Sequence, residues 1–182
     1  LGLNDLNSKI SFYDINDNYA LIFNEDDDTP DMVKIENDED YIPEGEEVVI
    51  SCLKSNSHPK QGVMIYKIAY KDKSLVYATD TEGYVGANKK LVLFARDTDL
   101  LIHDAQYTSE EYLNAYFSKQ GYGHSTFDMA LETFSQAKAK SLAFFHFDPN
   151  YNDEFLLEIE NHYTENCKNC FIPKEGQEIV LR

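Results

Sequence analysis

The sequence predicts a layered α/β or α+β domain, in which helices pack on a mixed β-sheet. In the first part of the chain the apolar residues come in short runs separated by turn residues, a pattern typical of strands that pair with one another. Further along, helical apolar spacing alternates with short buried runs, which indicates strands covered by helices. With 42% hydrophobic residues, 11 Phe and 13 Tyr in 182 residues, the chain can bury a substantial core.

The amino-terminal part is expected to be a set of strands. Alternating or continuous apolar runs predict strands at residues 9–15, 19–23, 47–53, 63–70 and 74–79. The polar run Lys71-Asp72-Lys73 separates the last two of these and predicts a hairpin turn.

Residues 24–47 form a very acidic stretch between two predicted strands. It contains Glu25-Asp26-Asp27-Asp28 and Asp38-Glu39-Asp40, and Lys34 is its only cation. Such a composition predicts a solvated, mobile excursion from the domain. Calcium binding is the alternative use of these carboxylates, but their spacing does not match an EF-hand loop.

In the second part of the chain, helices and strands are expected to alternate. Helices are predicted at 91–96, 109–119, 126–138 and 154–166, and strands at 100–103, 141–145 and 178–181. Ser125 is placed to cap the helix at 126–138. Since no internal repeat and no Pro/Gly/Ser-rich linker interrupts the pattern, residues 1–182 are expected to belong to one domain.

Charge and cysteine content restrict the partners and the compartment. A formal net charge of −17 repels polyanions, so a long nucleic acid is a poor partner, whereas a small anionic substrate held on metal is compatible. No run of about 18 apolar residues predicts a membrane span. The three cysteines, Cys52, Cys167 and Cys170, are expected to be free thiols in the cytoplasm. Cys167 and Cys170 have the C-x-x-C spacing of zinc and redox motifs, but no second pair accompanies them.

Several predicted strands lead directly to a residue that can bind metal. His58, Asp80 and His146 each follow an apolar run, and a rigid strand fixes the position of the loop after it. Imidazole and carboxylate groups are the ligands that zinc, manganese or iron use at hydrolytic centres. The ordinary alternatives are a hydrogen-bonded structural role for each histidine and a turn role for Asp80.

The order of these segments adds a resemblance to a known family. The ordered segments are Ser57-His58-Pro59, Leu75 to Glu82, Leu100 to Ala105, Gly123-His124-Ser125-Thr126 and Phe144 to Pro149. As a set they resemble the metallo-β-lactamase superfamily from about Ser8 onward, and most closely its phosphodiesterase and ribonuclease Z branch. The resemblance implies the carboxy-terminal half of the αββα sandwich of that family.

The resemblance also assigns roles to individual residues. It implies that His58 and His146 are metal ligands, and that Asp80 bridges two divalent metal ions, zinc or else manganese or iron, with no organic cofactor. It further implies that His124 donates a proton to the leaving oxygen of a phosphodiester, oriented by Asp104. Asp104 stands where ribonuclease Z usually has Glu, which shortens its reach. His103 is expected either to contact a metal ligand from behind or to be structural, and His162 to lie at the surface.

One part of the family pattern is absent from the sequence. The family supplies further ligands through His-x-His-x-Asp-His, and no such motif occurs here. The chain alone is therefore expected to be inactive or nearly so, to lack an amino-terminal half, and to associate with that half or with another copy of itself.

Three functions follow from these observations. The first is a phosphodiesterase acting on a small substrate such as a cyclic nucleotide, because the surface is acidic and no basic Gly-rich arm is present. The second is a non-catalytic binding or dimerisation module derived from the same fold. The third is an interaction protein that recruits basic partners through residues 24–47.

Overall fold

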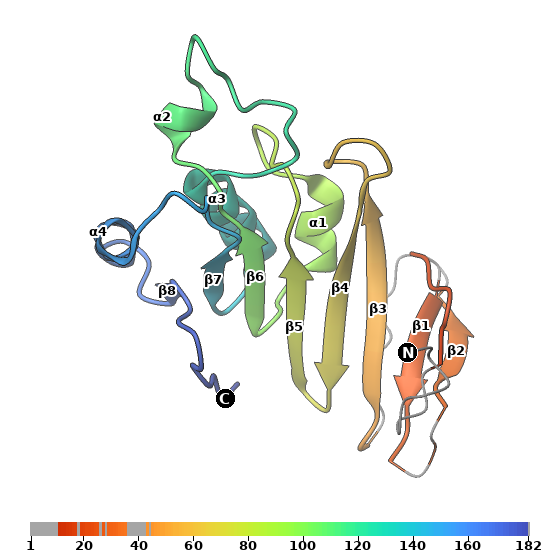
Figure 1. The fold of residues 1–182 in the computed structure, drawn as a ribbon. Coiled ribbons are helices and arrows are strands. Elements are labelled where there is room, and N and C mark those ends of the chain that lie inside the picture. The colour runs from red at the N-terminus through yellow and green to blue at the C-terminus, as the bar shows by residue number, and fades with distance from the viewer. Residues whose placement is uncertain are drawn as a thin grey trace, which may run out of the picture.

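The computed structural model describes residues 11–17, 19–25, 27, 29–35, 43 and 45–181. These residues form one eight-stranded sheet in the order β2-β1-β3-β4-β5-β6-β7-β8 (Figure 1). The strands are β1 (Tyr19–Phe23), β2 (Asp31–Lys34), β3 (Val48–Ser55), β4 (Val63–Tyr70), β5 (Lys73–Ala78), β6 (Leu100–Asp104), β7 (Leu142–Phe145) and β8 (Cys170–Phe171). The predicted mixed sheet with packed helices, and with it the α/β fold class, is confirmed.

Strand direction divides the sheet into two parts. From β2 to β5 every neighbouring pair is antiparallel, and β4 and β5 form the predicted hairpin. From β5 to β8 every pair is parallel. Parallel neighbours require crossover connections, which here contain the helices.

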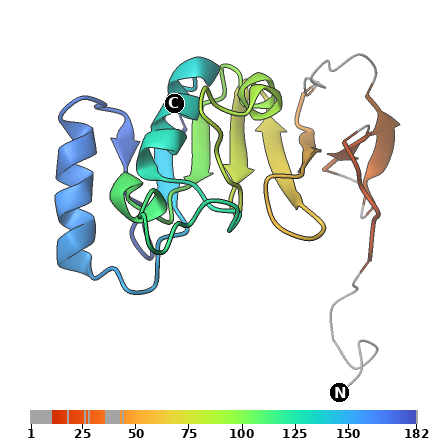
Figure 2. The same cartoon turned by 90° about the horizontal axis from the view of Figure 1, so that it is seen from above.

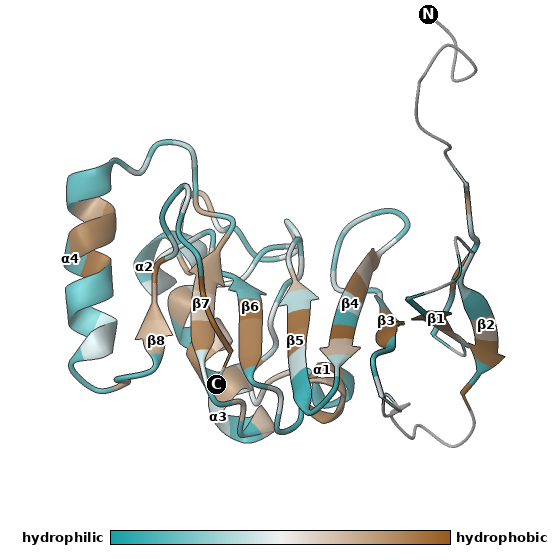
Figure 3. Ribbon diagram, turned by 90° about the horizontal axis from the view of Figure 1, so that it is seen from below, coloured by the Kyte–Doolittle hydropathy of each residue, from teal (hydrophilic) through white to brown (hydrophobic). Residues whose placement is uncertain are grey.

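The helices are α1 (Lys89–Phe94), α2 (Ser109–Tyr112), α3 (Phe127–Ala137) and α4 (Asp153–Thr164). Helices α1 and α3 contact each other and lie on the same side of the sheet (Figures 1 and 3). Helix α4 contacts β8 and closes one end of the molecule, while β1 and β2 form the other end (Figure 2). No helix among the described residues is both long enough and apolar enough to cross a bilayer.

The main hydrophobic core lies between the helices and β4–β7. It includes the fully buried Ile65, Val76, Leu101, Leu142 and Phe144, and hydrophobic stretches run along β6 and β7 (Figure 3). A second, much smaller cluster joins β1 to β3 through Ala20, Ile22 and Val49. The sheet is therefore stabilised unevenly along its length.

On the opposite face of the sheet, aromatic side chains remain partly exposed. The register places Tyr66 beside Tyr77, and Tyr77 contacts Phe145 with 6.0 Å between ring centroids. Because alternate residues of a strand point to opposite faces, these rings face away from Val76 and the main core. This face therefore carries partly exposed apolar surface.

Two predictions for the amino-terminal part need correction. Residues 11–15 of the strand predicted at 9–15 are not a strand, and residues 9 and 10 lie outside the described residues. The acidic stretch 24–47 is not wholly an excursion, because β2 lies within it and pairs with β1. Met32 and Val33 give β2 an apolar character that the surrounding carboxylates mask in the sequence. Much of the remainder of this stretch lies outside the described residues.

The helix predicted at 109–119 ends at Tyr112. The Asn114 side chain accepts hydrogen bonds from the backbone N–H groups of Tyr116 and Phe117 and so stabilises a turn there. Thr126 rather than Ser125 caps α3, because the Ser125 hydroxyl donates to the carbonyl of Thr81 instead. Residues 178–181 are not a strand, and β8 takes the place beside β7.

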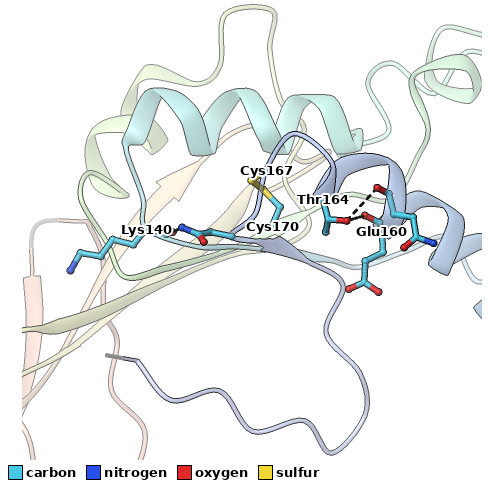
Figure 4. Close-up of a disulfide and its surroundings, with 7 residues drawn as sticks. Lys140, Glu160, Thr164, Cys167 and Cys170 are labelled. Carbon is cyan, nitrogen blue, oxygen red and sulfur yellow. Dashed lines mark hydrogen bonds between the residues drawn. A yellow bond between two sulfur atoms is a disulfide. The ribbon is translucent and has the colours of Figure 1, made fainter.

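The prediction of free thiols is wrong for two of the three cysteines. Cys167 and Cys170 form a disulfide in the turn between α4 and β8 (Figure 4). The backbone N–H of Cys170 donates to the carbonyl of Cys167, so the turn itself brings the two side chains together. Cys52 is free and buried, and burial, with a contribution from Asp17, raises the pKa of its thiol to about 11.

Candidate metal centre

The site lies where the parallel strands end. Asp104 is the last residue of β6, Asp80 follows β5 by two residues, and His146 follows β7 directly. Because neighbouring parallel strands end at the same edge of the sheet, these three side chains start close together. The arrowheads of β5 and β6 point toward this edge, where α2 and the following loop lie (Figure 1).

The structure brings all five residues of the predicted site together. Possible ligand atoms of His58, Asp80 and His124 lie within 4.8 Å of one another, and so do those of Asp104, His124 and His146. His146 Nε2 lies 3.3 Å from Asp80 Oδ1 and joins the two groups. Their roles as ligands or proton donor remain predictions, but their proximity is a property of the fold.

Asp104 is the centre of a buried polar network. Its carboxylate is fully buried and accepts hydrogen bonds from His124 Nδ1 at 2.8 Å and from the backbone N–H of Ser125 at 2.9 Å. The backbone N–H groups of Thr81 and Gln106 donate to the same carboxylate, each at 3.2 Å. Asp104 thus reaches His124 despite being shorter than Glu, because β6 and the loop before α3 approach each other closely.

The imidazole of His124 lies among other ionisable side chains. Its ring stacks on that of His146 at 4.9 Å and meets the edge of the His58 ring at 5.5 Å. Burial opposes protonation of His124, but the hydrogen bond and charge of Asp104 outweigh burial and raise the pKa of the imidazole above its ordinary value. The carboxylates of Asp80 and Glu82 act in the same direction.

The backbone at two of the strand ends is strained. Asp80 has φ of 53° and His146 has φ of 62°, both in the left-handed region that non-glycine residues rarely adopt. Such conformations cost of order 1 kcal/mol or more and persist where the surrounding structure requires them, which is often at functional sites. In both cases the conformation aims the side chain back toward the cluster.

The donor set fits a divalent metal ion. Nδ1 of His146 is buried and has no hydrogen-bond partner among the described residues, which is costly unless another group engages this side chain. Imidazole and carboxylate ligands suit zinc, manganese or iron. The two groups of close ligand atoms, His58–Asp80–His124 and Asp104–His124–His146, share His124, and each offers three donors, enough for one ion with an open position.

Sequence reasoning missed the residue that fixes the loop before His124. Glu82 accepts hydrogen bonds from the Tyr112 hydroxyl at 2.5 Å, from Gly121 N at 2.7 Å and from Gly123 N at 3.0 Å. The only signal was an acidic residue two positions after Asp80, which also suits an ordinary turn.

Gly123 is required by close packing against the candidate ligand His58. Its φ is 93°, and a Cβ there would lie 2.5 Å from His58 Cδ2 and 2.4 Å from Pro59 Cδ. His103 is fully buried, its Nδ1 lies 2.8 Å from the Asp104 carbonyl oxygen, and its Nε2 has no hydrogen-bond partner among the described residues. Burial lowers the pKa of His103. His162 is exposed on α4.

Comparison with known sequences points to one family. The family model for the β-lactamase superfamily domain matches residues 12–147. Ribonuclease Z of Thermococcus sibiricus is 36% identical over 122 residues, which are 67% of this chain and 32% of that protein. Ribonuclease Z of Bacillus subtilis is 34% identical over 99 residues, or 54% of this chain and 30% of that protein. The chain thus spans about a third of the length of these relatives.

Solved structures with the same fold include the metallo-β-lactamase fold protein YhfI from Bacillus subtilis, with a TM-score of 0.55 and 19% identity. That match covers 71% of this chain and 48% of YhfI. The short form of human tRNase Z has a TM-score of 0.55 and 20% identity, and the match covers 76% of this chain and 44% of that protein. From the family model, the curated relatives and the fold together, the chain belongs to the metallo-β-lactamase superfamily, in its ribonuclease Z-like branch.

Proposed function

We propose that this chain carries the proton-donating part, and some of the metal ligands, of a metal-dependent phosphodiesterase. The observation that carries the proposal is the hydrogen bond from His124 Nδ1 to Asp104. It leaves Nε2 as the free nitrogen of His124, in a group with His58 and Asp80. A proton donor beside a candidate metal site is what cleavage of a phosphodiester with a poor leaving group needs.

The residues of the chain would divide the work as follows. His58, Asp80 and His146 would hold a divalent metal ion, which when bound polarises the phosphoryl group and acidifies water. His124, with its raised pKa, donates the proton at Nε2 to the departing oxygen. Asp104 keeps the imidazole oriented and stabilises its protonated form, while its other hydrogen bonds hold the carboxylate in place.

Two substrate classes are supported by different observations. The net charge of −17 favours a small phosphodiester such as a cyclic nucleotide, since a long polyanion would be repelled. The similarity to proteins named ribonuclease Z and tRNase Z favours an RNA phosphodiester. In both cases we propose that activity requires ligands beyond those of this chain, and that the segment alone is inactive.

The first test is hydrolysis by the protein that the full reading frame encodes, compared with the 182-residue segment. The substrate is bis(p-nitrophenyl) phosphate with added zinc or manganese. We expect activity only in the longer protein and its loss in His146→Ala, with the surface variant His162→Ala as the matched control. Activity that survives His146→Ala unchanged would remove this cluster from the mechanism, and no hydrolysis by either protein would favour the non-catalytic module.

The role of His124 is tested with a second leaving group. His124→Ala should slow hydrolysis of a cyclic nucleotide by about 100-fold or more, the usual contribution of a general acid. It should slow bis(p-nitrophenyl) phosphate much less, because p-nitrophenolate leaves without needing a proton. Equal losses on both substrates would contradict the proton-donor role.

A further inference from the structure

The loop at residues 113–122 joins α2 to α3 and runs beside the candidate metal centre. The backbone N–H of Lys119 donates to the Tyr112 carbonyl at 3.1 Å, and that of Tyr122 donates to the Lys119 carbonyl at 3.2 Å. Glu82 holds the end of the loop through Gly121 and Gly123. The loop is therefore tied to the same segment that carries Asp80, and its side chains have defined positions relative to the site.

Lys119 lies between two aromatic rings next to His124. Its Nζ is 5.5 Å from the ring centroid of Tyr107 and 5.4 Å from that of Tyr122, within the range of cation–π contacts. The Tyr107 ring also meets the His124 ring edge-on at 6.3 Å. Lys119 and the proposed proton donor His124 therefore both contact the ring of Tyr107.

Lys119 is held by aromatic rings and not by a carboxylate of the described residues. Lys71, Lys73 and Lys140, by contrast, pair with acidic side chains. Within the described residues no carboxylate oxygen lies within 4.0 Å of Lys119 Nζ. Aromatic rings hold the ammonium without accepting its hydrogen bonds, so its donors remain available to an anion.

The loop also presents aromatic surface to solvent. Tyr122 is 57% exposed, Tyr116 89% and Phe117 80%. Exposed rings beside a cation suit a ligand that combines a phosphate with a flat base, because a nucleobase stacks on aromatic side chains while the phosphate pairs with the cation.

We propose that the loop is a nucleotide-recognition element, in which Lys119 binds a phosphate oxygen of the substrate and Tyr122 stacks on its base. The proposal rests on the proposed phosphodiesterase function and names the residues that would recognise the phosphate and the base of its substrate. Lys119 is a binding residue here, so its loss should weaken substrate affinity and leave the proton transfer by His124 largely intact.

Binding is measured by calorimetry on the complete protein with adenosine 5′-monophosphate and with ribose 5-phosphate, which lacks the base. Lys119→Ala should weaken both by about 10- to 100-fold, the value of a charge-assisted hydrogen bond. Lys119→Arg should restore most of the affinity. Tyr122→Ala should weaken only the adenosine nucleotide, by about 10-fold. Lys90→Ala, an exposed lysine on α1, is the matched control and should change neither.

Kinetics separate this proposal from the proposed function. On a cyclic nucleotide, Lys119→Ala should raise KM with little change in kcat. If the wild-type protein hydrolyses no phosphodiester but binds the nucleotide through Lys119, the proposed phosphodiesterase function is contradicted and the nucleotide-recognition element is supported. If hydrolysis occurs and Lys119→Ala behaves like Lys90→Ala, the recognition element is overturned. If the wild-type protein binds neither ligand at millimolar concentration, the recognition element is also overturned. The exposed rings would then be better explained as a contact surface for another protein.

Discussion

The two ends of the sheet differ in what their connections contribute. Between β5 and β8 the strands are parallel. The ends of these strands and the connections that follow them place four site residues at one edge of the sheet: Asp80, Asp104, His124 and His146. Between β2 and β5 the strands are antiparallel, and of the predicted site residues only His58 comes from that part. The same sheet therefore contains a chemically specialised end and an end that mainly extends it.

The two parts of the sheet also differ in the burial and hydrogen bonding of their carboxylates. Asp104 is buried, and several hydrogen bonds to its carboxylate fix the position of the side chain. Asp31, on the edge strand β2, is exposed to solvent. We therefore expect Asp104 to stabilise the fold and Asp31 to contribute little to its stability.

The largest effect is expected from removing the buried carboxylate. Asp104→Ala leaves several donors unpaired in the interior, among them the N–H groups of Thr81 and Ser125, and should lower the free energy of unfolding by about 3 kcal/mol or more. Asp31→Ala should change it by less than about 0.5 kcal/mol. Urea unfolding of both variants of the complete protein measures the contrast, and similar losses would contradict it.

A smaller contrast is expected between two valines in the two cores. Val76 is fully buried in the main cluster and Val49 is 2% exposed in the small one, so both changes to Ala remove the same atoms. Val76→Ala should cost about 2 kcal/mol, because close-packed helices and strands cannot collapse onto the cavity. Val49→Ala should cost about half as much, because the small cluster has fewer packed neighbours and can relax. Hydrogen exchange in β1 and β6 would show whether each loss stays local, and equal costs would mean that the two cores are packed alike.

The smallest effect concerns the ion pair between Asp99 and Lys140. Burial works against ionisation of Asp99, but Lys140 and the backbone N–H of Ser74 outweigh it and hold the pKa of the carboxyl below its ordinary value. A depressed pKa in the folded state means that the stabilisation is present above the unfolded pKa of about 4 and is lost as the pH falls through the folded value.

Asp99→Asn should therefore lower the free energy of unfolding by about 1 kcal/mol at pH 7 and much less near pH 2. Asp97→Asn, at an exposed neighbouring position, is the control and should change the free energy of unfolding by less than about 0.5 kcal/mol at pH 7. A constant difference between Asp99→Asn and wild type from pH 7 to pH 2 would contradict the assignment.

The sequence was most informative where periodicity and packing agree. Strand β4 and its hairpin to β5 follow from alternation and a polar turn, and Asp80 and His146 lie close together because each follows a strand. It was least informative where a single side chain decides the local structure. The Asn114 side chain accepts hydrogen bonds from the backbone N–H groups of Tyr116 and Phe117 and stabilises a turn just after α2. The Ser125 hydroxyl donates to the Thr81 carbonyl instead of capping α3. The hydrogen-bond partners of these two side chains cannot be inferred from the pattern of residues along the sequence.

Contacts between distant segments were also hidden. The hydrogen bonds of Glu82 join positions about 40 residues apart, and the disulfide depends on how α4 turns into β8. Residues 178–181, expected to be a strand, are not one, and the partner beside β7 is the two-residue strand β8, which no local pattern indicated.

The position of the site residues directly after strands has a consequence for how the molecule can vary. Connecting loops can lengthen, shorten or exchange their composition without moving Asp80, Asp104 or His146, since the ladder of backbone hydrogen bonds fixes where each strand stops. A single residue inserted within β7 would do the opposite, because it would turn every later side chain of the strand to the other face. Variation should therefore accumulate between the strands, in connections such as residues 113–122, while the register of the strands is kept.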